Sequence, residues 1–361
     1  MKSLTVGSAT IDTIAIIASD RIERMMMLNA DASFLLLQEG SKTEAIEIST
    51  HCGGGAVNTA VSLARLGFDS ATLVKLGQDQ RAETVLARLM TEKVSPRWAV
   101  RDGRAPTGAS VLVSSHERNA AIFTFRGANT LIEAKDLKND AFAVDLVHIA
   151  SLSNASADQF PAIVQKAKSQ GALVSVNPGP RQLAARAAAF EQCLGAIDIL
   201  SINRAEAEVL VPALVARFGE GGAALEGDNV PRLAARGFKN GGFHMSMRNL
   251  IGAVLSLGPK VLLITDGGQG AYAARDGEIV HASPKLVEVA GTAGAGDAFV
   301  STFAAFTAMG ASLEKALKAA SLNAAAVVGY VDTQTGLLTQ AKVEELLATE
   351  GDAMRIRRWK I

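Results

Sequence analysis

Apolar residues recur along this chain with two different periods. From Leu146 onward, short apolar runs alternate with stretches of helical period: 146–149 is strand-like, 160–169 helical, and the alternation continues through 173–176, 183–193, 197–202 and 204–210. Strands that alternate with helices of this length predict βαβ units and a parallel sheet. The pattern therefore predicts an α/β fold.

Two parts of the chain depart from that rhythm. Residues 34–37 and 45–48 flank a turn-prone segment and predict one hairpin, and 109–114 with 121–125 predict another. Residues 216–249 are rich in Gly and polar residues without a clear period, so we expect a surface insertion of loops and a short helix. The expected division is a main domain of residues 1–29, 51–105 and 130–361, and a discontinuous small sheet of residues 30–50 and 106–129.

The stretch 286–309 joins three features. A β-prone run at 286–289 precedes small residues at 291–296, and an amphipathic helix follows, with Asp297 in its first turn. A Gly-rich loop that opens a helix leaves backbone N–H groups free to bind an anion. Asp297 either caps this helix or accepts a hydroxyl proton beside a bound phosphate, as in phosphoryl transfer.

Bulk composition excludes several classes of protein. The 361 residues are 48% hydrophobic, and 36 basic residues balance 36 acidic ones, so no nucleic-acid or membrane partner is expected. No apolar run is long enough to span a bilayer, and acidic residues interrupt the first one. Cys52 and Cys193 form no metal or disulfide motif, which fits a cytoplasmic protein, and the five histidines lack ligand spacing.

Other polar residues follow predicted strands or open predicted helices. Asp12 comes soon after the first strand, and its carboxylate could accept hydrogen bonds from two hydroxyls or be an ordinary loop acid. The glycines Gly53 and Gly54, followed by Asn58 on a helix, permit close backbone approach to a ligand or a tight structural turn.

Two further motifs also carry two interpretations each. Asn203 and Glu206 share one face of a starting helix, so they could hold Mg²⁺ through waters or form a capping box. The segment 265–270 (TDGGQG) could line a nucleotide phosphate or make a plain turn. The sequence has no P-loop, no dinucleotide G-x-G-x-x-G after the first strand and no G-x-S-x-G elbow.

In chain order, six motifs resemble those of the PfkB/ribokinase family of sugar and nucleoside kinases. They cover most of the chain at compatible spacings, and six in order are far more specific than any one of them. The motifs are 53–58 (GGGAVN) with 64–67 (ARLG), 77–79 (GQD), the segment with PTG at 106–108, ER at 117–118 and GAN at 127–129, 203–206 (NRAE), 265–270 (TDGGQG), and 294–299 (GAGDAF).

This resemblance implies a ribokinase-like fold, with a doubly wound, mainly parallel sheet flanked by helices and a small β-sheet lid that closes on the substrate. It implies an ATP-dependent phosphotransferase that acts on a hydroxyl, commonly a hydroxymethyl group, of a sugar or sugar derivative. Lid strands often pair between subunits in the family, so a homodimer through the β-lid is expected. A nucleoside kinase and a non-catalytic binding protein on the same scaffold are the alternatives.

The resemblance also assigns roles to residues. Asp297 would be the base, beside an anion hole formed by Gly294, Ala295 and Gly296. The substrate would contact Asp12, Gly53, Gly54, Asn58 and Arg118. Asn203 and Glu206 would organise Mg²⁺ and the ATP phosphates, while Thr265, Gly267, Gly270 and Asn323 would line the nucleotide.

Two positions depart from the family pattern. Gly291 stands where the family usually has an Asp that helps to hold a monovalent cation, so the resemblance leaves activation by K⁺ open. Ser175 stands where an Asp precedes the Asn that is Asn177 here. Neither change removes the expected base, Asp297.

Overall fold

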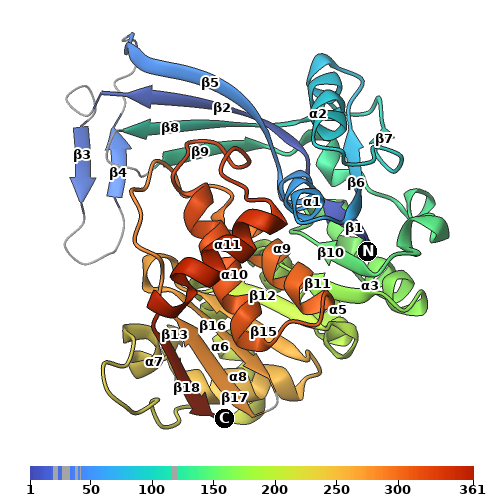
Figure 1. Ribbon diagram of the computed structural model, residues 1–361. Coiled ribbons are helices and arrows are strands. Elements are labelled where there is room, and N and C mark those ends of the chain that lie inside the picture. The colour runs from blue at the N-terminus through green and yellow to red at the C-terminus, as the bar shows by residue number, and fades with distance from the viewer. Residues whose placement is uncertain (19–22, 27–32, 37–39, 41, 116–119, 276) are drawn as a thin grey trace.

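The computed structural model describes residues 1–18, 23–26, 33–36, 40, 42–115, 120–275 and 277–361. A ten-stranded sheet runs through its centre (Figure 1). Seven neighbouring strands are parallel, and three antiparallel strands complete one edge. Across the sheet the strands are β18 (Ile356–Lys360), β17 (Glu278–Ala282), β16 (Ala271–Arg275), β15 (Val261–Thr265), β12 (Ile199–Asn203), β11 (Leu173–Val176), β10 (Leu146–Ile149), β1 (Lys2–Gly7), β6 (Asp69–Leu76) and β7 (Val100–Arg101).

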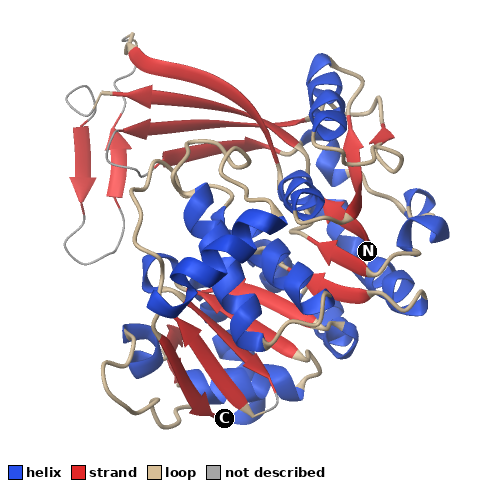
Figure 2. Ribbon diagram, in the orientation of Figure 1, coloured by secondary structure: helices blue, strands red, loops and turns tan. Residues whose placement is uncertain are grey.

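Helices cover both faces of this sheet, as the apolar runs predict (Figures 1 and 2). Strands buried on both faces are apolar at nearly every position, and β10 and β15 follow this rule. One face packs against α1 (Gly55–Arg65), α9 (Ala295–Ala308), α10 (Leu313–Val327) and α11 (Gln340–Glu350), with α2 (Gln80–Thr91) beside α1. The other packs against α3 (Phe160–Ser169), α4 (Pro180–Ala185), α5 (Ala187–Cys193), α6 (Arg204–Phe218), α7 (Arg232–Arg236) and α8 (Met247–Ser256). The predicted doubly wound α/β fold is confirmed.

A separate four-stranded sheet projects from one end of the molecule (Figure 1). Its strands, in order, are β5 (Ala45–Gly53), β2 (Thr10–Ile17), β8 (Gly108–Ser115) and β9 (Ala120–Phe125). The predicted hairpin of 109–114 with 121–125 is confirmed as β8 and β9.

The other predicted hairpin is wrong. β4 (Ser33–Leu36) pairs with β3 (Glu23–Met26), whereas β5 pairs with β2, so residues 34–37 and 45–48 are not partners. The turn-prone residues between them do not join paired strands. The small sheet therefore begins earlier in the chain than expected, with β2.

Residues 216–249 are more ordered than an insertion of loops. They include the end of α6, the short helix α7 and the antiparallel pair β13 (Phe238–Asn240) and β14 (Phe243–Met245). Leu233, Phe238 and Met245 are buried and join the hydrophobic core on the α6 and α8 side. Spaced apolar residues anchor this segment although no single period runs through it.

The carboxyl ends of the parallel strands lie on one side of the molecule, which is where ligands bind in open α/β sheets. β1 ends at Gly7, β12 at Asn203 and β15 at Thr265, and the N-terminus of α9 lies beside this edge. Within the described part of the chain, none of the helices has both the length and the apolar character needed to cross a membrane.

Candidate active site

Asp297 lies in the first turn of α9, as predicted. Gly294 precedes the helix in a left-handed conformation with φ of 80°, and its Cα packs so closely on Thr333 that a Cβ would lie 2.7 Å from the Thr333 Cβ. Glycine is the residue that tolerates both conditions. The start of α9, and with it the Asp297 carboxylate, is therefore fixed by a glycine.

The Asp297 side chain is partly buried, and its Oδ2 accepts a hydrogen bond from Asn58 Nδ2 at 2.8 Å. Burial raises the pKa of Asp297 to about 6; the Asn58 hydrogen bond opposes that rise and the nearby Asp12 charge adds to it. The carboxylate is therefore a stronger base than an exposed aspartate, because burial disfavours its charged form.

Asp12 belongs to the small sheet and not to the large one. It lies within β2, not at the end of β1, so the expected position at a strand end of the large sheet is wrong. Its Oδ1 accepts a hydrogen bond from Ser110 Oγ at 2.5 Å, and burial raises its pKa. The charge of Asp12 also raises the pKa of Asp297, so the two carboxylates interact electrostatically.

The glycines before α1 bring the backbone close to these carboxylates. A Cβ on Gly53 would collide with Asp12 Oδ2, and one on Gly54, which has φ of 95°, would lie 2.6 Å from the Ser8 carbonyl oxygen. A Cβ on Gly55 would lie 3.6 Å from Asp297 Oδ1 and 2.9 Å from the Ala150 Cβ. This glycine run therefore lies between the two acids, next to the end of β10.

A cavity of about 340 Å³ opens beside the N-terminus of α9. Thr265, Gly267 and Gly270 line one side of it, and Ala295 and Gly296 another, so the structure brings these predicted residues together. Its remaining walls are mainly apolar, which suits a flat heterocyclic base. Those walls come from the segment 284–292 and from the side of α10 that carries Ser321, Ala324, Ala325 and Val328.

A second, more polar cavity of about 540 Å³ adjoins the first through Thr265, Gly267 and Gly296. Asn203 and Asn177 line it. Asn203 and Glu206 also form the capping box of α6: Glu206 N donates to Asn203 Oδ1 and Asn203 N to Glu206 Oε2, each at 2.9 Å. Burial raises the pKa of Glu206 to about 7. Among the described residues no group of three or more His, Cys, Asp or Glu gathers as a metal site.

A comparison with protein families identifies the family of this chain. Residues 20–340 match the family described as pfkB family carbohydrate kinase. The chain belongs to the pfkB family of carbohydrate kinases. It is therefore a sugar kinase, an ATP-dependent enzyme that transfers a phosphoryl group to a hydroxyl of a sugar.

Individual relatives agree with the family. The chain is 25% identical over 295 residues to a ribokinase of Staphylococcus aureus (strain COL), covering 80% of this chain and 84% of that protein. It is 26% identical over 339 residues to a deoxyribokinase of Salmonella typhi, covering 93% and 98%. A ribokinase of Arabidopsis thaliana, solved with ribose and ATP, shares the fold with a TM-score of 0.69 at 21% identity, covering 96% and 98%. A ribokinase of Thermotoga maritima superposes with a TM-score of 0.72 at 19% identity, covering 96% and 99%.

Three motifs of this pfkB kinase tie the small sheet to the main domain. Asp79 accepts hydrogen bonds from the Thr107 backbone N–H and hydroxyl, both at 2.7 Å, and also caps α2. Asn129 makes two hydrogen bonds to Ala9 in the β1–β2 connection. Its Oδ1 accepts from the Ala9 N–H at 2.9 Å, and its Nδ2 donates to the Ala9 carbonyl oxygen at 2.8 Å. These motifs therefore fix the base of the small sheet beside Asp12.

One residue predicted to line the nucleotide, Asn323, does not line either cavity. Asn323 is fully buried; its amide donates to Thr302 Oγ1 at 2.7 Å and accepts from Leu338 N at 2.9 Å, so its neighbours on α10 line the cavity instead. Arg118 lies outside the described residues. Gly291 offers no carboxylate, and a Cβ there would lie 3.0 Å from the Tyr330 carbonyl oxygen.

Sequence reasoning missed several residues of the site. Residues 286–289 form no strand but line the apolar cavity, and their β-branched composition gave no sign of this role. Thr333 and Gln334 both donate to Asn58 Oδ1, at 2.9 and 3.0 Å. Arg126, at the end of β9, donates to Ser153 Oγ at 2.5 Å near the end of β10. No local pattern marks these three residues.

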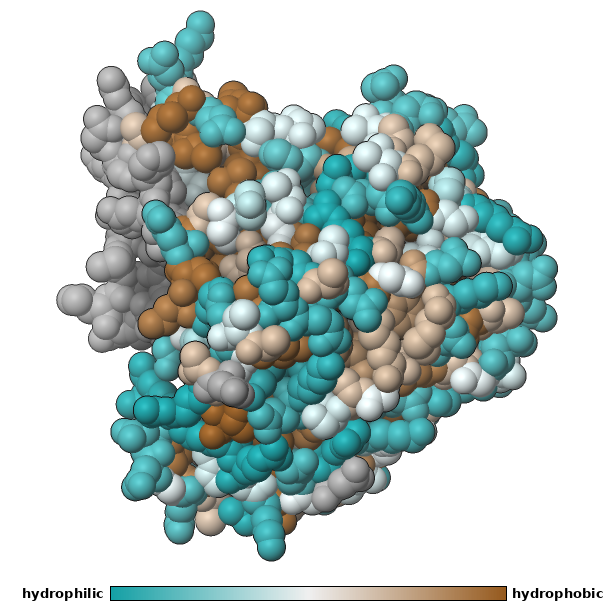
Figure 3. Space-filling model, in the orientation of Figure 1, coloured by the Kyte–Doolittle hydropathy of each residue, from teal (hydrophilic) through white to brown (hydrophobic). Residues whose placement is uncertain are grey.

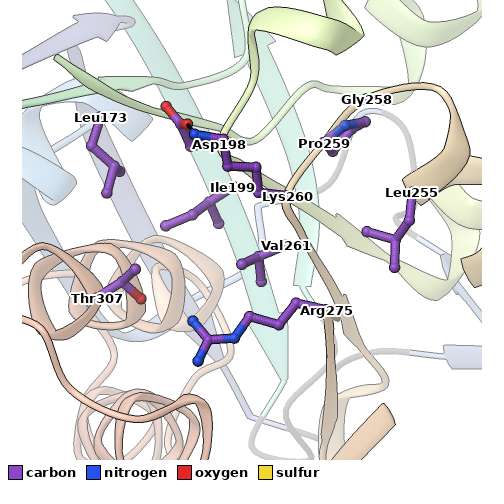
Figure 4. A pocket seen from close by; sticks show the side chains of 10 residues that line it. All are labelled: Leu173, Asp198, Ile199, Leu255, Gly258, Pro259, Lys260, Val261, Arg275 and Thr307. Atoms are coloured by element: carbon purple, nitrogen blue, oxygen red, sulfur yellow. Dashed lines mark ion pairs between the residues drawn. The ribbon is translucent and has the colours of Figure 1, made fainter. Parts of the chain in front are cut away.

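Another cavity, of about 500 Å³, lies at the amino ends of the parallel strands (Figure 4). Leu173, Ile199 and Val261 line it at the beginnings of β11, β12 and β15. Asp198 there accepts from Lys260 at 2.8 Å and from Lys168 at 2.8 Å, and these pairs lower its pKa. The cavity is remote from Asp297, because it lies at the amino ends of the parallel strands and Asp297 lies near their carboxyl ends.

Proposed function

We propose that Asp297 is the general base of this sugar kinase. It takes the proton of a sugar hydroxyl held between the two sheets as that oxygen attacks the γ-phosphorus of ATP. The observation that carries the proposal is the position of the Asp297 carboxylate, in the first turn of α9, next to the cavity beside Gly296 and across the glycine run 53–55 from Asp12. A pKa raised by burial keeps this carboxylate basic yet mostly ionised at neutral pH.

ATP would occupy the two adjoining cavities. The apolar cavity suits the adenine, and the phosphates would extend past Thr265 and Gly267 toward the first turn of α9. The N–H groups that open a helix have no intrahelical partner, so those around Gly294, Ala295 and Gly296 would bind the transferring phosphoryl group. Phosphoryl transfer depends mostly on such positioning and charge stabilisation.

Mg²⁺ would accompany the nucleotide with few direct protein ligands. The site residues fit this mode, because Mg²⁺ keeps several waters and takes one or two carboxylates together with substrate phosphates. Asn203 lines the polar cavity and Glu206 lies behind it in the same capping box. Asn203 and Glu206 would hold the ion, with Glu206 also keeping Asn203 in place, and the ion would supply positive charge that neutralises the phosphates.

A pentose is the first substrate class to test. Asp12 Oδ1 and Oδ2 can accept two sugar hydroxyls, and the relatives include a ribokinase and a deoxyribokinase. The glycine run that begins at Gly53 brings the backbone against the Asp12 carboxylate that would hold the sugar. The small sheet would act as a lid that excludes water from the reacting phosphoryl group.

The decisive experiment compares wild type with Asp297→Asn in an Mg-ATP coupled assay against pentoses, hexoses and nucleosides. We expect kcat with the preferred sugar to fall about 10²-fold or more, about 3 kcal/mol of barrier, with KM changed little. Circular dichroism would verify that the variant is folded. Near-normal turnover by a folded Asp297→Asn would refute the role of the base.

The small sheet also supports a homodimer. Register places Ile48, Val111, Phe123 and Phe125 on the face of this sheet opposite Asp12, and each of these side chains is exposed. Figure 3 shows apolar side chains gathered over this part of the molecule. Contiguous exposed apolar surface of this kind is typical of a protein–protein interface.

A further inference from the structure

Within the described residues, the Asp297 carboxylate accepts a hydrogen bond from one side chain, that of Asn58. Asn58 Nδ2 lies 2.8 Å from Asp297 Oδ2. An Asn amide presents N–H₂ at one end and a carbonyl oxygen at the other, and only the N–H₂ end stabilises a carboxylate. If the amide of Asn58 turned over, its oxygen would face the ionised acid and the pKa of Asp297 would rise.

Two donors hold the other end of the Asn58 amide. Thr333 Oγ1 donates to Asn58 Oδ1 at 2.9 Å, and Gln334 Nε2 donates to the same oxygen at 3.0 Å. Asn58 and Gln334 are only 3% and 2% exposed, so water cannot readily replace either bond. Turning Asn58 over would put its N–H₂ against the N–H₂ of Gln334, which is unfavourable in a buried site.

The direction of the Gln334 amide is itself determined by an arginine. Arg88 Nε donates to Gln334 Oε1 at 2.9 Å. Arginine has no acceptor, so Gln334 must present its oxygen to Arg88 and its N–H₂ to Asn58. The hydrogen bonds therefore run in one direction, from Arg88 through Gln334 and Asn58 to Asp297.

Neighbouring groups hold Arg88 and Gln334 in place. Arg88, on α2, pairs with Glu92 at 2.9 Å. The Gln334 backbone N–H donates to Asp332 Oδ1 at 2.8 Å, and its carbonyl accepts from Arg65 Nη1 at 2.9 Å. Satisfied buried networks of this kind fix one arrangement of their members.

We propose that Arg88 and Gln334 are positioning residues for the base. They fix the Asn58 amide with its donor toward Asp297, and so set the lowest pH at which the enzyme works. The inference rests on the proposed function of Asp297, but it concerns residues that do not touch the sugar or ATP. Arg88 acts from a different helix, through two side chains.

The test is the pH profile of kcat/KM for Gln334→Glu. A Glu still accepts from Arg88, but its second oxygen faces Asn58 Oδ1, which favours the reversed amide of Asn58. We expect the midpoint of the acid limb to move up by about one pH unit, with about a tenfold lower kcat/KM below that midpoint. Gln165→Glu, an exposed Gln-to-Glu change on α3, is the matched control and should leave the profile unchanged.

A second pair of variants tests the proposal even if Gln334→Glu does not fold. Arg88→Lys keeps a donor toward Gln334 and should keep the wild-type midpoint, whereas Arg88→Met removes the donor and should raise the midpoint. A role confined to packing would lower activity at every pH and leave the midpoint in place. If folded Gln334→Glu and Arg88→Met both keep the wild-type midpoint, the proposal is wrong, whereas Asp297 as the base is tested separately by Asp297→Asn.

Discussion

At the scale of single residues, the proposed site depends on two acids that lie on either side of the glycine run 53–55. Burial raises the pKa of both Asp12 and Asp297, and the charge of Asp12 raises that of Asp297 further. Asn58 opposes the rise at Asp297, and Ser110 opposes it at Asp12. The balance leaves one acid able to take a proton near neutral pH while the other can accept sugar hydroxyls.

This balance predicts how activity depends on pH. Asp297 must be ionised to act as a base, and its pKa is about 6, so kcat/KM should fall about tenfold per unit as pH drops below 6. Asp12→Asn removes a like charge, so the acid limb should move to lower pH even though sugar affinity weakens. A steady-state pH series on both proteins measures this. An acid limb that moved upward in Asp12→Asn would contradict the coupling of the two acids.

At the scale of elements, periodicity located most helices and strands but not their distant partners. The strand at 146–149 and the helix at 160–169 appear as predicted because each is set by its own apolar pattern. The predicted hairpin of 34–37 with 45–48 is wrong because no local signal says that the run at 45–48 joins β2. The same limit explains Asn58, whose partner Thr333 is 275 residues away in the chain.

The motif 294–299 could be predicted because its chemistry is local. A glycine, a helix start and an acid in the first turn are adjacent in sequence, and α9 begins at Ala295. Asn203 and Glu206 show the reverse case. Their spacing suited both a capping box and a metal site, and the structure contains the capping box.

The start of α9 yields a prediction with a matched control. Gly294 and Gly310 both have φ near 80°, but only Gly294 contacts another segment, at Thr333. Gly310→Ala should lower the free energy of unfolding by about 1 kcal/mol through backbone strain alone and leave kcat unchanged. Gly294→Ala adds a clash and should lower it by about 2–4 kcal/mol, with kcat at least tenfold lower because Asp297 moves. Denaturant titrations and kinetics on the pair measure the difference; equal effects would contradict the argument.

At the scale of the whole molecule, the large sheet contains a polar row under α1 and α9. Thr5, His148 and Ser175 are neighbours across β1, β10 and β11. His148 is fully buried, its Nδ1 lies 3.1 Å from Ser175 Oγ, and its Nε2 has no hydrogen-bond partner among the residues that the structure describes. Global unfolding exposes this imidazole to water.

Stability should therefore depend on the protonation of His148. Burial lowers its pKa from 6.5 to about 4, so the folded chain keeps it neutral while the unfolded chain takes up a proton below pH 6.5. The free energy of unfolding should thus fall between pH 6.5 and 4, with a contribution of about 3 kcal/mol from this residue. Denaturant titrations should show this loss reduced in His148→Gln and retained in Ser175→Ala. An identical pH dependence in wild type and His148→Gln would rule the histidine out.

Association through the small sheet can be tested with two adjacent residues. Phe123 and Ile122 are both about 60% exposed, but they lie on opposite faces of β9, because side chains alternate along a strand. Phe123 shares its face with Val111 and Ile48, whereas Ile122 lies on the face that carries Asp12.

If two copies pair through the outer apolar face, Phe123→Asp should weaken the dimer at least 100-fold in sedimentation velocity, because it buries a charge without a partner. Ile122→Asp should leave the dimer intact. A wild-type chain that is monomeric at 50 μM, or a dimer lost only in Ile122→Asp, would exclude this interface.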